Sequence, residues 1–594
     1  MKAFKFSPFL LIIPLFILVW GFVYFNYCDT FYSRAVDPEY PYLINGLNVA
    51  LLEFNRIGHF DHPGTPFQVY CGVIIRITHL FTGKDAIAQD VFNRPDDYLA
   101  AINFSLIILQ AVLCFFIAFV GKKREIKTWQ LILLQSGVLF HALMLELFSR
   151  VIPERWLIVV SLLFIIVYLL YGYKDKHPLK FAIWSGIIMG MGMATKFNFL
   201  PLLFLPFLLI NSNKNRLIYA GTGIASFFVF LLPIVKKLGH YLYFIAKIAT
   251  HDGIYGQGTE RMFDPVNVKN GFLDIFKCAP ELMFVIFAML AAIILAIIYR
   301  KKEKTNRELL FFIGIFFIVL LQIVMVSKHF KNTYLLPVFT IYPLFLFQFD
   351  CFIRKIGAYK KWTFVPAIFL FTVFIAFTAN DFLKNKKYFF ENIAQRETMR
   401  TYVSNNLSSN TLWFVEPTWE SAPYVENGIV YGLCYSHCGK SYLSELINVN
   451  PNIITYEGSE NDVGVWRRRS IPIDSIVVTG VPIHIFSSPG RNAAVLMEIL
   501  EKAASRNNMV LFTDTLFSNH ARNSHIIVMQ NQQIEQVWKT ENLISREADI
   551  RFVMQSIYGT PEWLEDVKKK AQEKNIPLDS MVLLDAIWVV DNLH

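Results

Sequence analysis

The chain has 594 residues, of which 54% are hydrophobic and only 17% are charged. Soluble domains carry about a quarter charged residues, so this balance argues against a wholly soluble protein and predicts a polytopic membrane protein with some soluble mass attached. The net charge of +10 does not indicate nucleic-acid binding, because the basic residues form short runs between apolar segments, which is the distribution that membrane topology predicts.

Membrane-spanning helices are expected where about 20 consecutive residues are mainly apolar. The first such run has no small-residue cleavage site after it, so we expect an uncleaved helix and not a signal peptide. About eleven spans are predicted in all. They cover residues 7–26, 98–120, 129–148, 156–172, 181–195, 198–211, 217–235, 281–299, 309–327, 333–349 and 362–379.

The distribution of Lys and Arg predicts the orientation of these spans. Five loops hold eighteen basic residues in about forty positions, whereas residues 27–97 hold five in seventy-one. The positive-inside rule then places the N-terminus and the basic loops in the cytoplasm and residues 27–97 outside. The basic loops are 121–127, 173–180, 212–216, 299–308 and 353–361.

The apolar stretch 67–82 within this first outer loop does not fit the alternation as a span. Its Arg76 and His79 stand three residues apart, on one face of a helix. We therefore predict an amphipathic helix on the outer membrane surface, with a true span as the alternative.

From about residue 385 the composition becomes that of a soluble α/β domain. We predict a membrane domain over 1–384 and an extracytoplasmic domain over 385–594. Thr560 and Pro561 mark the start of a helix over 561–574, and a second helix is expected at 491–506. Strands are expected at 411–415, 428–432, 474–479, 509–513 and 524–529.

Acidic residues follow the first and third expected spans. Asp37 and Glu39 begin the first outer loop in "RAVDPEYPYLINGLNVA", where a simple turn is the alternative interpretation. Glu154 stands at the mouth of the fourth span, and an ionisable group there is a functional candidate. The nearby Glu146 and Arg150 are four residues apart, which suits a local ion pair.

Two further outer segments carry polar side chains next to glycine and proline. "IGHFDHPGTPFQ" contains His59, Asp61 and His62, and "THDGIYGQG" contains His251 and Asp252. We expect these residues to line a substrate cleft. The alternative is that their side chains satisfy local backbone groups.

Cationic residues gather in the later outer loops. Lys196 follows an apolar span in "MATKFNFLP", and Lys328, His329 and Lys331 lie within four positions of "SKHFKNTYLLP". Cations beside an apolar wall suit the phosphate of a membrane lipid. The alternative is an anchor at the membrane interface, where lysines extend towards the headgroups.

Taken together, these motifs resemble the GT-C superfamily of integral-membrane glycosyltransferases, such as protein mannosyltransferases and lipid A aminoarabinose transferases. The resemblance covers about residues 1–380. It rests on Asp37-Pro38-Glu39 in a long first outer loop, Glu154 after the third span, "TKFNFLPLL" at 195–203 and "KH…YLLP" at 328–337. Here Pro38 separates two acidic residues that form an Asp-Glu pair in the mannosyltransferases.

The resemblance implies a hexosyl- or pentosyltransferase of the cell envelope in a bacterial inner membrane. Its donor would be a sugar on a polyprenyl phosphate, and its acceptor a lipid, a glycan or a protein. Asp37 would be the general base, and Glu154 would assist it or share a divalent cation with it; no cofactor is certain. Lys196, Lys328, His329 and Lys331 would hold the phosphate, with Glu39 and the cleft residues around the substrate.

Two other classes remain open at this level. A transporter or flippase for a lipid-linked saccharide needs ionisable groups near the middle of its spans. Apart from Glu281 at the first position of its span, the expected spans contain only His141 and Glu146, both in the third. The second alternative is a non-catalytic envelope-assembly protein that presents the outer domain.

Overall fold

The computed structural model describes residues 7–593 apart from 29, 35, 61–63, 301–305, 357–371, 373–375, 377–378, 381–382, 384–396, 406–409, 418–421, 423, 437–441, 488–492, 520–523, 533–548 and 575. The chain forms two compact units. The first contains Met1–Leu407, Val415–Thr455 and Gly464–Arg469, and the second contains Ser408–Phe414, Tyr456–Val463 and Ser470–His594. The expected domain boundary at 384/385 falls in a stretch outside the described residues.

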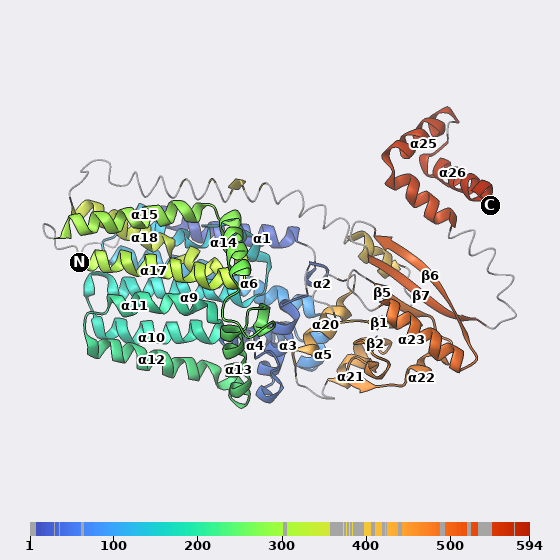
Figure 1. The fold of residues 1–594 in the computed structure, drawn as a ribbon, viewed down its shortest axis with the longest axis horizontal. Helices are drawn as coiled ribbons and strands as arrows, with labels where there is room; N and C mark the ends of the chain where they lie inside the picture. The colour runs from blue at the N-terminus through green and yellow to red at the C-terminus, as the bar shows by residue number, and fades with distance from the viewer. Residues whose placement is uncertain are drawn as a thin grey trace. The chain divides into compact units, whose positions relative to one another are not determined.

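Long apolar helices run alongside one another in the first unit (Figure 1). Their sequences are apolar on most faces, which suits helices that contact both lipid and neighbouring helices. They are α1 (Ile12–Tyr27), α6 (Pro95–Lys123), α9 (Pro153–Val167), α10 (Pro178–Thr195), α12 (Asn213–Leu231), α15 (Glu281–Ile298), α17 (Asn306–Lys328) and α18 (Leu336–Lys355).

Seven helices among the described residues are long and apolar enough to cross a membrane. The number rises to eight if the bent pair Thr128–Val138 and Ala142–Ser149 forms one span; this pair contains α7 (Thr128–Gln135) and α8 (Ala142–Glu146). The prediction of a multi-pass membrane protein is therefore confirmed, while eleven spans and their orientation stay predictions. The expected span 362–379 lies almost wholly outside the described residues.

Two of the expected spans are not single long helices. The expected span 129–148 is broken, with an angle of 72° between its two halves. The stretch expected as span 198–211 is a short apolar helix, Phe197–Leu209, which includes α11 (Phe204–Leu209). Pro201 lies inside its 3-10 turn, where a proline removes a backbone donor and interrupts regular α-helix.

Shorter helices gather at one end of the bundle, where α13 and α14 run across the direction of the long helices (Figure 1). The expected helix over 67–82 is confirmed as α4. It packs closely on α3. The approach is so close that a Cβ atom added at Gly46 of α3 would lie 2.8 Å from the Cβ atom of Cys71 on α4. These helices are α2 (Phe31–Arg34), α3 (Glu39–Ala50), α4 (Thr65–Thr82), α5 (Ile87–Asn93), α13 (Leu238–Thr250) and α14 (Pro265–Cys278).

Part of the chain beyond the long helices also belongs to the first unit. It contains α20 (Val425–Cys434), α21 (Leu443–Val449) and the paired strands β2 (Ile453–Thr455) and β3 (Gly464–Val465). The strand predicted at 428–432 was wrong, because this segment is the middle of α20. Gly428 and Gly432, one helical turn apart, let α20 lie directly on Tyr40 of α3, a long-range contact that overrides the β-branched local sequence.

The second unit contains a sheet with helices. Strand β1 (Leu412–Val415) pairs in parallel with β5 (Ile483–Ser487), and β7 (Ser524–Gln532) pairs antiparallel with both β5 and β6 (Val510–Asn519). The strands predicted at 411–415, 509–513 and 524–529 are confirmed. The remaining elements after residue 465 are β4 (Arg469–Ser470), α22 (Ile473–Val477), α23 (Ala493–Arg506), α25 (Pro561–Glu573) and α26 (Leu578–Leu593).

The strand predicted at 474–479 was wrong, since α22 covers most of it. Ile473, Ile476 and Val477 are the buried residues of α22, and their spacing of three and four is that of a helix face. The helices predicted at 491–506 and 561–574 are confirmed, the second with Thr560 as N-cap and Pro561 in its first turn.

Candidate active site

Asp37 lies two residues before the start of α3, a helix that is buried along its whole length. Burial raises the pKa of Asp37, and the positive charges of His59, Lys331 and Arg150 lower it in part. Three cationic or potentially cationic side chains from distant parts of the chain therefore act on this carboxylate through their charge. A carboxylate with a raised pKa beside cations is the arrangement expected of a general base.

Arg150 fixes the acidic motif from the loop that precedes α9. Its guanidinium donates to both carboxylate oxygens of Glu39, with Nη2 to Oε2 at 3.0 Å. Nη2 also donates to the carbonyl oxygen of Asp37 at 3.1 Å. Glu39 is fully buried, so a bidentate contact of this kind holds the start of α3 against the loop. Arg150 thereby fixes the backbone that carries Asp37.

Glu154, in the first turn of α9, forms a buried ion pair with Lys196, which caps the end of α10. Lys196 Nζ donates to Glu154 Oε1 at 2.7 Å, and their side chains are 8% and 4% exposed. The same carboxylate oxygen accepts from Thr333 Oγ1 at 3.3 Å. The ammonium also lies 4.6 Å from the centre of the Tyr334 ring. The pair joins α9 and α10 to the loop before α18.

Lys331 is the exposed cation of this group. Its charge acts on both Asp37 and Glu154, yet its side chain forms no hydrogen bond or ion pair with another described residue. The pKa of Tyr255 is raised to about 12, mainly by burial, and the charges of Tyr334, Lys196, Asp37 and Glu154 also act on it. Lys331 is therefore the cation best placed to receive an anionic ligand.

His59 is held from several sides, partly through its backbone. The amide of Gly58 donates to Asn45 Oδ1 at 2.9 Å, and Gln68 Nε2 donates to the carbonyl of His59 at 3.0 Å. The imidazole lies edge-on to the rings of Tyr42 and Tyr435, with centroids 5.3 and 5.2 Å away. The structure thus brings His59 to the site, whereas Asp61 and His62 lie outside the described residues.

The predicted basic cluster at 328–331 divides into two parts. Lys328 Nζ donates to the carbonyls of Ile248 and Ala249 at 2.6 and 3.0 Å. Burial and the charge of Lys328 lower the pKa of His329, with Asp252 acting in the opposite direction. Lys331 alone of the cluster acts on Asp37 and Glu154.

The predicted residues His251 and Asp252 lie on the loop that follows α13. Asp252 accepts from the amide and hydroxyl of Thr259, at 2.9 and 2.6 Å. His251 Nδ1 lies 3.0 Å from Thr250 Oγ1. Both residues therefore stabilise their own loop, and a role in substrate binding stays a proposal.

Asp37 and Glu154 were also candidates for sharing a divalent cation. No group of three or more His, Cys, Asp or Glu that suits a metal ion forms within the described part of the chain. Lys196 already occupies Glu154 Oε1, and an ammonium there competes with a divalent cation for the carboxylate. The described residues therefore provide no third ligand for a cation shared by Asp37 and Glu154.

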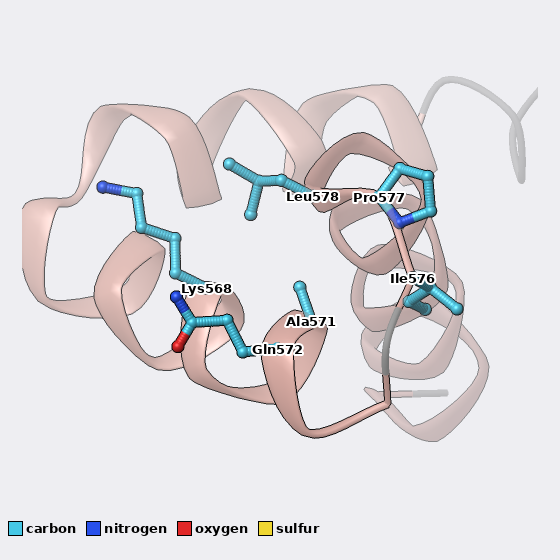
Figure 2. A pocket seen from close by; sticks show the side chains of 6 residues that line it. All are labelled: Lys568, Ala571, Gln572, Ile576, Pro577 and Leu578. Carbon is cyan, nitrogen blue, oxygen red and sulfur yellow. The ribbon is translucent and has the colours of Figure 1, made fainter.

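One surface pocket lies elsewhere, in the second unit. It has a volume of about 490 Å³ and sits where α25 meets the start of α26 (Figure 2). Its lining contains a single charged group, so it lacks the converging polar groups of a catalytic site. The lining residues are Lys568, Ala571, Gln572, Ile576, Pro577 and Leu578.

Sequence reasoning missed the tyrosines of the site. Tyr334 directly follows the basic loop, and its position after "KHFKNT" is a signal that could have pointed to it. Tyr255 lies in the glycine-rich loop already singled out, but tyrosines are common at membrane interfaces and do not stand out there. Tyr435, whose ring packs against His59, was assigned to a separate domain, so no local signal connected it with the site.

The fold and the site define a multi-pass membrane protein in which acidic and cationic side chains meet at the ends of α9, α10 and α17. Residues 97–327 match the model of glycosyltransferase family 87. The match contains Arg150, Glu154 and Lys196, and it confirms the resemblance to integral-membrane glycosyltransferases.

Two solved structures also match the chain. They are ArnT from Cupriavidus metallidurans bound to undecaprenyl phosphate, with a TM-score of 0.41, and the same protein in the apo state, with a TM-score of 0.42. In both cases the sequence identity is 10%, and the match covers 86% of this chain and 97% of that chain. No curated protein matches the sequence.

Proposed function

We propose that this protein transfers a sugar from a polyprenyl-phosphate-linked donor to an acceptor hydroxyl on the outer side of the membrane. The observation that carries the proposal is the partly buried carboxylate of Asp37, on which the charges of Lys331, Arg150 and His59 act at the ends of apolar helices. The match to a glycosyltransferase family supports it. The acceptor is a lipid, a glycan or a protein.

The proposed reaction needs one base and one group of cations. Asp37 takes the proton of the acceptor hydroxyl. At the same time the oxygen of that hydroxyl forms a bond to the anomeric carbon of the sugar. The bond between that carbon and the phosphate oxygen breaks, and the phosphate keeps the electron pair. Lys331, supported by Lys196 and Arg150, stabilises the negative charge that grows on the leaving phosphate.

Transfer of label from a donor distinguishes this function from a flippase. Membranes that contain the protein are incubated with radiolabelled sugars on polyprenyl phosphate, and the free lipid phosphate and the labelled acceptor are measured. A transferase separates the label from the lipid, whereas a flippase moves the donor intact. Recovery of the intact donor with every sugar tested would overturn the proposal.

Lys331→Gln is expected to raise the donor KM or lower kcat by about tenfold, because it removes an exposed cation that faces Asp37 and Glu154. Lys331→Arg is expected to be milder, since the contact is mainly one of charge. Donor-titrated kinetics on purified variants measure both effects. Lys328→Gln and His329→Gln are the matched controls, because these side chains interact with residues 248–252. If they change the donor KM or kcat more than Lys331→Gln does, the phosphate binds near residues 248–252 and not near Lys331.

Residues 27–97 and the chain after residue 385 are expected to lie on the same, non-cytoplasmic side. Single cysteines at Glu53 and Pro451, placed in a background without native cysteines, should react with a membrane-impermeant maleimide from outside. A cysteine at Lys123, in a basic loop, should react only after the membrane is opened. Labelling of Glu53 and Pro451 from opposite faces would contradict the orientation.

A further inference from the structure

A second arginine lies five residues after Arg150, in the first turn of α9. Arg155 is only 1% exposed. Its Nη1 donates to Asn103 Oδ1 on α6 and, at 3.0 Å, to the carbonyl of Arg150. Its guanidinium carbon lies 5.5 Å from the centre of the Phe148 ring. Arg155 therefore connects α6 and α9 to the backbone that carries the Arg150 side chain.

The surroundings of Arg155 do little to stabilise its charge. Among the residues that the structure describes, no carboxylate contacts the guanidinium, and Nη2 is buried without a hydrogen-bond partner. The same holds there for the buried Nδ2 of Asn103. A buried charge without an opposite charge costs free energy, and a well-packed apolar side chain is often more stable in its place. Stability therefore does not account for an arginine at this position, at the start of a helix able to cross a membrane.

The residue that Arg155 holds is the one that fixes the acidic motif. Arg150 follows the 3-10 turn Leu147–Ser149 in an extended conformation. Its amide donates to that turn at 3.0 Å, and its carbonyl accepts from Arg155. Its side chain donates to both carboxylate oxygens of Glu39 and to the carbonyl of Asp37. A shift of the Arg150 backbone would therefore also displace the groups that hold Asp37.

We propose that Arg155 is a positioning residue for sugar transfer. It holds Arg150, and through Arg150 it keeps Asp37 in the geometry that the reaction needs. The inference rests on the proposed function, in which Asp37 is the base. A base must lie within hydrogen-bonding distance of the proton that it takes, and a misplacement of about 1 Å can reduce the rate about 10²-fold. An unpaired buried guanidinium is a departure from optimal stability of the kind expected near a functional site.

The test compares the stability and the kinetics of Arg155→Met. Thermal unfolding in detergent and donor-titrated transfer are measured on the purified full-length protein at matched protein levels. We expect the Tm to be equal to or above that of the unmodified protein, because an unpaired buried charge is removed. We expect kcat to fall about tenfold to a hundredfold and the donor KM to stay within about twofold, because the alignment of the base changes and the phosphate-binding cation does not.

Two further variants separate positioning from packing. Arg155→Lys keeps a donor for the Arg150 carbonyl and should therefore lose less kcat than Arg155→Met. Arg124→Met is the matched control, because Arg124 also donates to backbone carbonyls, those of Leu169 and Leu170, but beyond the other end of α9. Its kcat should stay close to that of the unmodified protein.

The results also distinguish this inference from the proposed function. An unchanged kcat in Arg155→Met, a Tm that falls together with kcat, or an equal loss of kcat in Arg124→Met would overturn the positioning role, while sugar transfer by the unmodified protein stands. Absence of transfer by the unmodified protein from every donor tested would instead overturn the proposed function, and the positioning role with it.

Discussion

Asp37→Asn is expected to reduce sugar transfer by about 10²–10⁴-fold, the range typical of a lost general base. The amide has nearly the same shape, so Arg150 can still donate to the carbonyl of residue 37 and membrane insertion should be unchanged. Initial rates of transfer at saturating donor, compared at matched protein levels, measure the effect. Asp85→Asn is the control, because Asp85 is an exposed carboxylate in the same outer segment.

The pH dependence gives a second measurement of the same role. Burial raises the pKa of Asp37, so kcat/KM should fall, as the pH is lowered, at a higher pH than an ordinary aspartate would give. The charge of Lys331 acts in the opposite direction and lowers the pKa of Asp37. Lys331→Gln should therefore move this acid limb to still higher pH. Near-normal activity of Asp37→Asn, or an acid limb unmoved by Lys331→Gln, would remove Asp37 from the mechanism.

Glu154→Gln is expected to destabilise the protein by about 3–5 kcal/mol, because it leaves the ammonium of Lys196 buried without its carboxylate. The two side chains are 4% and 8% exposed, so water cannot replace the lost partner. Thermal unfolding in detergent measures the effect as a lower Tm. The double variant Glu154→Gln with Lys196→Met should recover much of the loss, since neither charge is then buried alone.

The exposed pair of Lys277 and Asp274 is the matched control for this prediction. Its side chains are 75% and 43% exposed, and exposed ion pairs contribute only about 0–1 kcal/mol. Asp274→Asn should therefore leave the Tm nearly unchanged. A Glu154→Gln variant with the Tm of the unmodified protein would show that Lys196 finds another partner or loses its proton, and that the buried pair does not hold α9 to α10.

The membrane character of the chain could be predicted from the sequence, because it depends on local composition. A run of about 20 apolar residues identifies a span wherever it occurs, and seven of the expected spans coincide with helices able to cross a membrane. Asp37, Glu154, Lys196 and Lys331 were also recognisable, since ionisable groups beside apolar runs are rare and conspicuous. The helix at 67–82 followed from its periodicity.

Only the tertiary structure decided which of these residues act on one another. Glu39 and Arg150 are 111 positions apart, and Glu154 and Lys196 are 42 apart. No local pattern specifies such pairs, because they arise when helices pack and bring loop ends together. The same limit applies to the basic loop. Lys328 and His329 interact with residues 248–252, whereas the charge of Lys331, their neighbour in sequence, acts on Asp37 and Glu154.

The segment after the long helices shows the physical reason most clearly. Residues 428–432 have a local preference for strand, yet Gly428 and Gly432 pack against Tyr40 as part of a helix. The side chains that decide this outcome lie on α3, almost 400 residues earlier, as the hydrogen bond between Tyr442 and Asn48 across 394 positions also illustrates. Local sequence determined the apolar helices and their charged ends, whereas long-range packing determined the site.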